Sequence, residues 1–111
     1  MRIPFLFSFA LSPVLLMGNP TGATVVHGDV TLSDQNKVLE IRASDHSIIN
    51  WEGFSIDLGE LTSFIQPNEQ AVVLNRVMSN LPTSILGDLK ANGQIFLLNP
   101  NVVSEMSLNL W

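Results

Sequence analysis

The segment that decides the fold is Ile48-Ile49-Asn50, a pair of apolar residues followed by a polar one, because this pattern returns along the chain. Its other copies are Val25-Val26-His27, Val73-Leu74-Asn75 and Leu97-Leu98-Asn99. Successive copies begin 23, 25 and 24 residues apart. Two further sets of apolar residues keep a 24-residue interval: Val30, Phe54 and Met78, and Ile41, Ile65 and Leu89. A repeat of this length, with a few short strands in each copy, is typical of one coil of a parallel β-helix.

The sequence around the repeat predicts an all-β chain. Val, Ile and Thr are frequent in short runs, which Gly, Asn, Asp and Pro interrupt, and no window keeps a helical period between caps. The expected strands are Thr24–Val26, Val30–Leu32, Val38–Arg42, Ile48–Trp51, Phe54–Ile56, Leu61–Ile65, Ala71–Leu74 and Gln94–Leu98. Residues 80–88, which include Pro82, are expected to form a loop or an irregular turn.

Stacking of the repeats predicts a parallel β-helix of about four coils. Main-chain hydrogen bonds would hold neighbouring coils roughly 4.8 Å apart, so that equivalent side chains form ladders and the apolar ones fill the interior. Asn50, Asn75 and Asn99 are expected to form one such ladder at a corner, because Asn tolerates left-handed backbone and bonds nearby main-chain groups.

The size and charge of the chain exclude several classes of protein. With 111 residues it has room for one small domain, and 46% hydrophobic against 14% charged residues argues against a disordered tail. The net charge is -5 and the five basic residues do not cluster, so a nucleic-acid partner is not expected.

The first 23 residues are predicted to be a secretory signal peptide. Met1-Arg2 provides a positive start, and an uncharged apolar stretch follows to Met17, which is short for a membrane span. The cleavage pattern fits Thr21-x-Ala23, and a cut near Gly18 is the alternative; an uncleaved anchor or a misassigned start would also explain the segment. The chain has no Cys, which excludes a lipoprotein anchor and any disulfide.

No catalytic or metal site is expected. Ser44-Asp45-His46-Ser47 contains triad residue types, but sequence neighbours on a turn rarely adopt triad geometry. His27 and His46, the only histidines, lack the spacing of a zinc site, and the Asp residues lack the alternation of a calcium loop. Polysaccharide lyases share the β-helix architecture and are the enzyme alternative, but the basic residues are too few and too dispersed for one. We therefore expect no enzyme, no cofactor and no small-molecule substrate.

From Asn19 to Asn101, the chain resembles the N-terminal two-partner-secretion domain, or haemagglutination activity domain, of filamentous haemagglutinin-type exoproteins. The segments that carry the resemblance are Asn19-Pro20-Thr21-Gly22, Thr24-Val25-Val26-x-Gly28, Ile48-Ile49-Asn50-Trp51-x-x-Phe54, Phe64-x-Gln66-Pro67, Val73-Leu74-Asn75-Arg76-Val77, Ser84-Ile85-Leu86-Gly87-x-Leu89 and Ala91-Asn92-Gly93-Gln94-Ile95-Phe96-Leu97-Leu98-Asn99-Pro100-Asn101. The resemblance implies a right-handed parallel β-helix and export through the periplasm. It also implies recognition by an outer-membrane pore with periplasmic transport-associated domains, and delivery of an adhesin, haemagglutinin or toxin carrier to the cell surface or the medium.

Five residues of the shared motifs are the candidates for the secretion signal: Asn75, Arg76, Asn99, Pro100 and Asn101. An equally good interpretation of the asparagines is that they form turns between coils, and both roles are compatible. Arg76 is expected either to contact the transporter or to pair with a carboxylate on the coil surface.

The resemblance stops soon after Asn101. Val102 stands where the family pattern has Gly, and residues 102–111 form a divergent tail beyond the predicted domain of residues 24–101. This departure favours a truncated or degenerate gene product, with a non-functional remnant as the alternative function; a genuine short relative or a gene-model error would also account for it.

Overall fold

The computed structural model describes residues 18–101 and the backbone of residues 103–106. The described residues form strands and turns, which confirms the all-β prediction. The strands are β1 (Thr24–His27), β2 (Val30–Gln35), β3 (Val38–Ala43), β4 (Ser47–Trp51), β5 (Leu61–Ile65), β6 (Val72–Val77), β7 (Thr83–Ile85), β8 (Asp88–Ala91), β9 (Gln94–Leu98) and β10 (Val103–Met106). The predicted signal segment lies outside the described residues as far as Met17.

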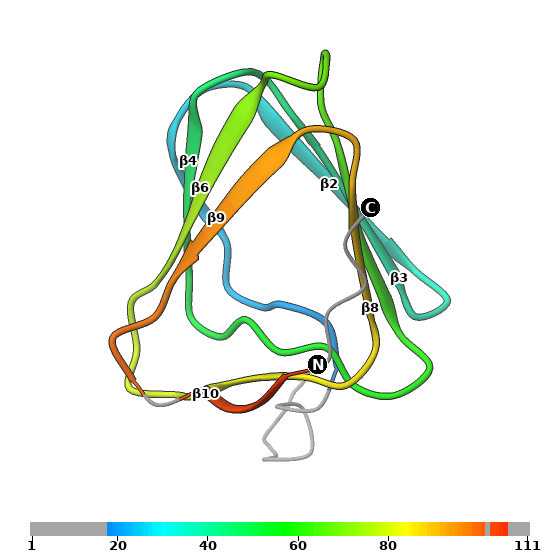
Figure 1. The fold of residues 1–111 in the computed structure, drawn as a ribbon, viewed down its shortest axis with the longest axis vertical. Coiled ribbons are helices and arrows are strands. Elements are labelled where there is room, and N and C mark those ends of the chain that lie inside the picture. The colour runs from blue at the N-terminus through cyan, green and yellow to red at the C-terminus, as the bar shows by residue number, and fades with distance from the viewer. Residues whose placement is uncertain (1–17, 102, 107–111) are drawn as a thin grey trace, which may run out of the picture.

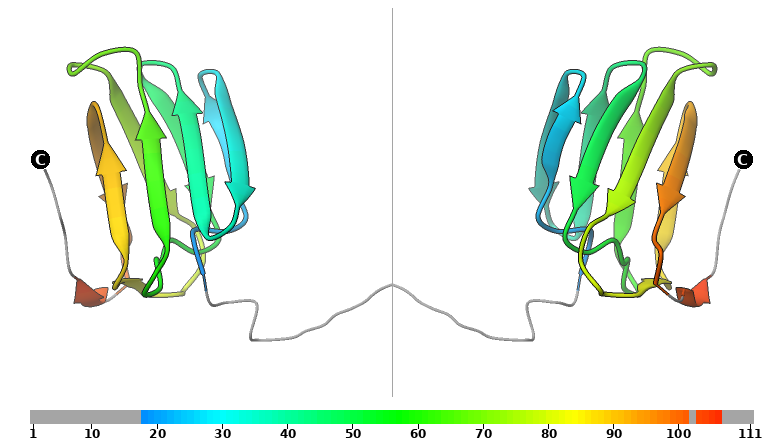
Figure 2. Two further views of the ribbon diagram at one scale, coloured as in Figure 1. Left: turned by 90° about the vertical axis from the view of Figure 1, so that its right-hand side faces the viewer. Right: turned by 90° about the vertical axis from the view of Figure 1, so that its left-hand side faces the viewer.

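The strands stack into three walls around a common interior, which gives the triangular outline of Figure 1. The first wall has the order β2-β3-β5-β8 and the second has the order β1-β4-β6-β9. The third wall consists of β7 and β10, extended by a single bridge between Ile56 and Ile85. From β3 onward the strands within each wall are parallel, and the side views show successive passes of the chain lying side by side (Figure 2).

The N-terminal end of the stack is antiparallel, which contradicts the prediction that Val25-Val26-His27 opens the first parallel coil. Strand β1 pairs antiparallel with β4, and β2 pairs antiparallel with β3. The turn between β2 and β3 is the reason, because Asn36 and Lys37 both have positive φ, at 52° and 66°. Two such residues form a tight hairpin turn, and a hairpin joins antiparallel strands.

The predicted asparagine ladder is also wrong. Asn50 pairs with Arg76, at an offset of 26 residues, and Asn75 lies between Ile49 and Leu97. The loops between successive passes differ in length, so no constant interval describes the register. A slip of one residue moves a side chain to the opposite face of the sheet, which is why equal spacing predicted the wrong neighbours.

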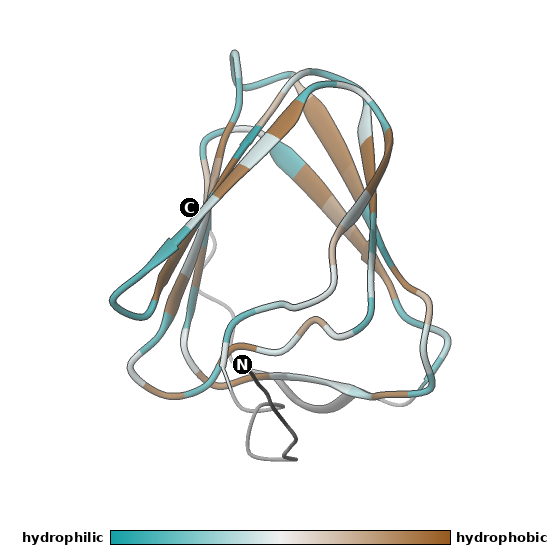
Figure 3. Cartoon of the chain, turned by 180° about the vertical axis from the view of Figure 1, so that it is seen from behind, coloured by the Kyte–Doolittle hydropathy of each residue, from teal (hydrophilic) through white to brown (hydrophobic). Residues whose placement is uncertain are grey.

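The interior is filled by alternate residues of the strands. Strands β3 to β6 alternate between buried and less buried positions, as expected for a sheet with one face on a core. The core cluster consists of Leu39, Ile41, Ala43, Ile49, Trp51, Phe54, Ile56, Phe64, Val73, Val77, Ile85 and Leu89, and Ile95 and Leu97 of β9 pack against it. Figure 3 shows hydrophobic colours along the strands and hydrophilic colours at many of the turns.

Two predictions about the third wall need correction. Strand β7 lies within residues 80–88, which were predicted to be a loop, and Phe54–Ile56 forms a single bridge where a strand was predicted. Each pass crosses the third wall in three residues or fewer of paired backbone, too short for a periodic signal. The predicted tail at 102–111 begins by continuing this wall, because β10 pairs in parallel with β7.

Candidate recognition surface

Asn75 is fully buried and connects three successive passes of the chain. Its Oδ1 accepts a hydrogen bond from Trp51 Nε1 at 2.9 Å, and its Nδ2 donates to the carbonyl of Phe96 at 3.2 Å. A buried polar group needs such partners, because it loses its hydrogen bonds to water on folding. In the folded chain this side chain therefore holds β4, β6 and β9 together and is closed to a partner.

Arg76 follows Asn75 on β6 and points to the outer side of the second wall. Its Nε donates to Asn50 Oδ1 at 2.9 Å, and the two residues are neighbours in the register. Among the described residues, no carboxylate lies within ion-pair distance of its guanidinium. The described residues therefore do not provide the carboxylate on the coil surface that was one of the two partners expected for Arg76.

Residues 99–101 form a turn that connects β9 to β10. Asn99 Oδ1 accepts from the backbone N–H of Asn101 at 2.9 Å, which fixes the turn locally. Asn99 Nδ2 donates to Thr83 Oγ1 at 2.8 Å and to the carbonyl of Leu81 at 3.1 Å, so the turn is also joined to the preceding pass. Between the two asparagines, Pro100 is exposed.

This turn is the last step of a ladder of turns at one corner. Asn101 Nδ2 donates to the carbonyl of Ser79 at 2.9 Å, and Ser79 Oγ donates in turn to the carbonyl of Glu52. One pass earlier, the backbone N–H of Glu52 donates to the carbonyl of Thr21 at 3.0 Å, and Thr21 and Gly53 form a bridge. A corner ladder therefore exists, but Ser, Asn and main-chain groups form it.

A second corner depends on Gln66 and Asn92, which sequence reasoning did not select. Buried Gln66 donates from Nε2 to the carbonyls of Ala71 and Gln94, both at 3.0 Å, and accepts from the N–H of Gly93. Asn92 and the backbone of Gln66 exchange two hydrogen bonds, at 2.7 and 2.9 Å. Both residues lie in segments that carry the family resemblance, and this resemblance is the feature of the sequence that could have identified them.

The Ser44–Ser47 turn does not assemble a triad. Ser47 Oγ donates to the carbonyl of Ser44 at 2.7 Å, while the His46 ring lies 3.2 Å from Asp45 and its side chain is 77% exposed. The side chain of His27 is hydrogen-bonded to the carbonyl of His46 at 3.0 Å, and no second polar side chain is joined to it among the described residues. No group of three or more His, Cys, Asp and Glu in the described part of the chain is arranged to hold a metal ion.

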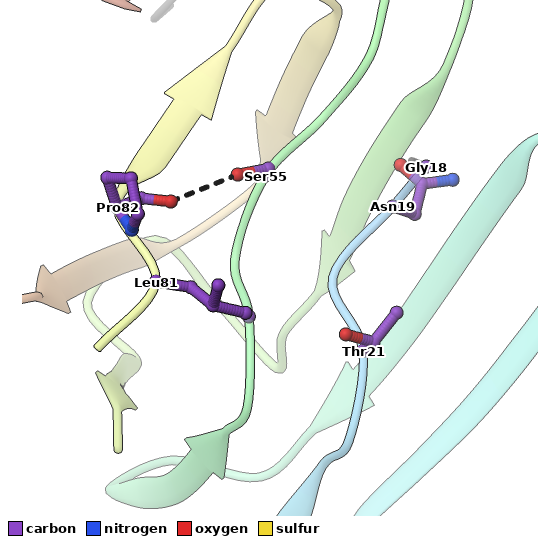
Figure 4. A pocket seen from close by; sticks show the side chains of 7 residues that line it. Gly18, Asn19, Thr21, Ser55, Leu81 and Pro82 are labelled. Carbon is purple, nitrogen blue, oxygen red and sulfur yellow. Dashed lines mark hydrogen bonds between the residues drawn. The ribbon is translucent and has the colours of Figure 1, made fainter. Parts of the chain in front are cut away.

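A shallow cavity of about 170 Å³ lies where residues 18–21 cross the third wall (Figure 4). Its lining residues are Gly18, Asn19, Thr21, Gly53, Ser55, Leu81 and Pro82. Ser55 Oγ is bonded to the carbonyl of Pro82 and to the N–H of Ser84, and no lining side chain is charged. The cavity therefore offers no charged side chain that would bind a polar metabolite.

Comparison with known proteins identifies chains that are similar to this one in sequence and in fold. The model of the TPS secretion domain matches residues 17–104. Two heme/hemopexin-binding proteins of Haemophilus influenzae are 38% and 35% identical, over 86 and 85 residues, to 76% of this chain, which spans only 9% of their length. The crystal structure of the HMW1 secretion domain from Haemophilus influenzae is 39% identical, with a TM-score of 0.73 over 84% of this chain and 24% of that one. The part of the chain described here contains no helix of the length and apolarity that a membrane crossing requires.

Proposed function

This chain belongs to the family of TPS secretion domains, which target exoproteins for two-partner secretion, and we propose that its folded coil is what the transporter recognises. The family is secreted across the outer membrane, and a TPS domain implies recognition by a TpsB-type outer-membrane transporter. The role of such a domain is targeting, without catalysis. The observation that carries the proposal is the match over residues 17–104 together with the shared fold.

The architecture that we propose is a right-handed parallel β-helix. Strands β3, β5 and β8 begin three parallel passes, and the antiparallel β1 and β2 precede them as a further layer, which makes about four layers in all. The connection from β3 to β5 runs through β4 and back to the same wall, and crossovers between parallel strands are right-handed in nearly all proteins.

We propose that the five secretion-motif candidates divide into two roles. Asn75, Asn99 and Asn101 act by fixing the coil, which is supported by their hydrogen bonds to neighbouring passes. Arg76 and Pro100 are presented to the partner, which is supported by their positions on the outer side of the second wall and at the exposed corner.

The proposed partner is an outer-membrane pore with periplasmic transport-associated domains. The chain would pass through the periplasm and reach the cell surface or the medium as part of a filamentous haemagglutinin-like adhesin. Since the chain spans 9% of the curated relatives, the heme and hemopexin binding in their names is not transferred to it.

The test is secretion from cells that carry the two-partner transporter, compared with cells in which its gene is deleted. We expect the chain in the medium of the cells that carry the transporter and in the periplasm of the cells that lack it. Retention in the periplasm of both would favour the non-functional remnant, and equal amounts in both media would exclude two-partner secretion as the route.

A further inference from the structure

The two large walls differ in the side chains on their outer faces. The first wall carries four charged residues on its outer face: Glu40, Arg42, Asp88 and Lys90. The strands of the second wall contain one, Arg76. The two walls have the same number of strands and enclose the same interior, so this difference in charge is a difference between their outer faces.

Apolar side chains on the outer face of the second wall lie opposite one another on neighbouring strands. Ile48, Leu74 and Phe96 are paired across β4, β6 and β9, and Leu98 stands beside Arg76 in the next row. Phe96 is 53% exposed and Leu98 is 54% exposed, which is unusual for side chains of their size. Parallel strands that are apolar on both faces are characteristic of sheets covered on both sides.

Arg76 provides the specific chemistry of this face. Asn50 holds its Nε, so the guanidinium is oriented while its terminal amino groups have no carboxylate partner among the described residues. An oriented guanidinium accommodates a carboxylate through two parallel hydrogen bonds, and an apolar surrounding strengthens that contact by excluding water. The complementary surface is one carboxylate among apolar side chains.

A second copy of this chain does not provide that surface. In a two-fold contact centred on the face, each Arg76 would lie near the other, and the strands of the second wall supply no acidic residue to separate them.

We propose that Ile48, Leu74, Phe96 and Leu98, arranged around Arg76, form the surface on which a periplasmic domain of the transporter docks. That domain presents a carboxylate, which pairs with Arg76, among apolar side chains, which cover the second wall. This inference rests on the proposed function and adds the contact surface to it.

Two variants test the surface, each with a matched control on the outer face of the first wall. Arg76→Glu reverses the charge, and Arg42→Glu is its control, since Arg42 is exposed and its ion pair within the described part of the chain is with Glu40, at 3.4 Å. Phe96→Ser combined with Leu98→Ser removes the exposed apolar side chains, and Val38→Ser, 40% exposed, is the control. The ratio of secreted to periplasmic chain should fall about tenfold or more for Arg76→Glu and for the Phe96→Ser, Leu98→Ser double variant. It should stay within about twofold for the two controls. Thermal melting of the purified chains shows whether each variant folds.

A photo-crosslinking residue in place of Leu74, which lies on the middle strand of this face and away from the open end at β9, identifies what covers the face during secretion. The expected product joins the chain to the transporter, and the same probe in place of Val38 gives none. A product containing two copies of this chain would overturn the proposal, as would undiminished secretion of both folded variants. If secretion of the unmodified chain does not depend on the transporter, the proposed function fails instead, which separates the two conclusions.

Discussion

Asn75 and Arg76 are neighbours in sequence, yet the pleat of β6 directs one side chain to the core and the other outward. The family motif that contains both therefore combines two kinds of constraint. Asn75 is required by the hydrogen bonds of the interior, whereas no contact among the described residues requires a positive charge at Arg76.

Replacing Asn75 by Ala should destabilise the fold by about 2–3 kcal/mol, because the Trp51 indole N–H and the Phe96 carbonyl would lose a partner in the interior. Urea denaturation measures the loss. Asn50→Ala is the control, since it removes only the bond to Arg76 at the half-buried outer face, and it should cost less than about 1 kcal/mol. Equal midpoints for the two variants would show that the buried contacts contribute nothing.

The mature chain should retain Asn19, which favours a signal cut near Gly18 over one after Ala23. Buried Asn19 accepts from Thr62 Oγ1 at 2.8 Å and donates to the carbonyl of Lys37 at 3.2 Å. A cut after Ala23 would leave the fully buried Thr62 hydroxyl without this partner and would remove the bridge between Thr21 and Gly53. Intact-mass analysis of the periplasmic chain decides the matter, and an N-terminus at Thr24 would contradict this expectation.

At the scale of the elements, the sequence predicted strands better than it predicted their neighbours. Leu61–Ile65 and Gln94–Leu98 were predicted with the bounds that β5 and β9 have, because their apolar runs end at clear turn residues. Register depends on loop length, and unequal loops placed Asn75 beside Ile49 and Leu97, away from the other asparagines of the expected ladder. The polar corner at Gln66 depends on contacts between residues far apart in sequence, which no local pattern indicates.

The corner between the first and second walls should tolerate no side chain at Gly93. A Cβ there would lie 2.6 Å from Gln66 Nε2 and 2.9 Å from the carbonyl of Ala71. Gly93→Ala should therefore cost roughly 1–3 kcal/mol in the free energy of unfolding. At Gly53 the nearest atoms would be 3.5 Å away, so Gly53→Ala is the control and should stay within about 0.5 kcal/mol of the unmodified chain. If both variants unfold at the same urea concentration, the close approach at Gly93 has no energetic importance.

At the scale of the whole molecule, the two ends of the stack differ. Strands β1 and β2 lie across one end as antiparallel partners of β4 and β3. At the other end, β8 and β9 have no further strand beside them among the described residues. A cavity of about 330 Å³ opens there between the two strands, lined by Leu89, Lys90, Ala91, Gly93, Gln94, Ile95 and Phe96. With no Cys in the chain, the ladders of main-chain hydrogen bonds hold the stack together, and they end at these two strands.

The chain should therefore self-associate through the end formed by β8 and β9. Unpaired main-chain groups along an edge strand, next to the apolar side chains of Ile95 and Leu97, form a template for another chain. Light scattering should show an average mass that rises with concentration in the range of tens of micromolar. Leu97→Lys places a charge that points into the open end and should lower this mass, whereas Val38→Lys, on the outer face of the first wall, should not. A constant monomer mass together with a cooperative thermal transition would mean that this end is covered and would contradict the expectation.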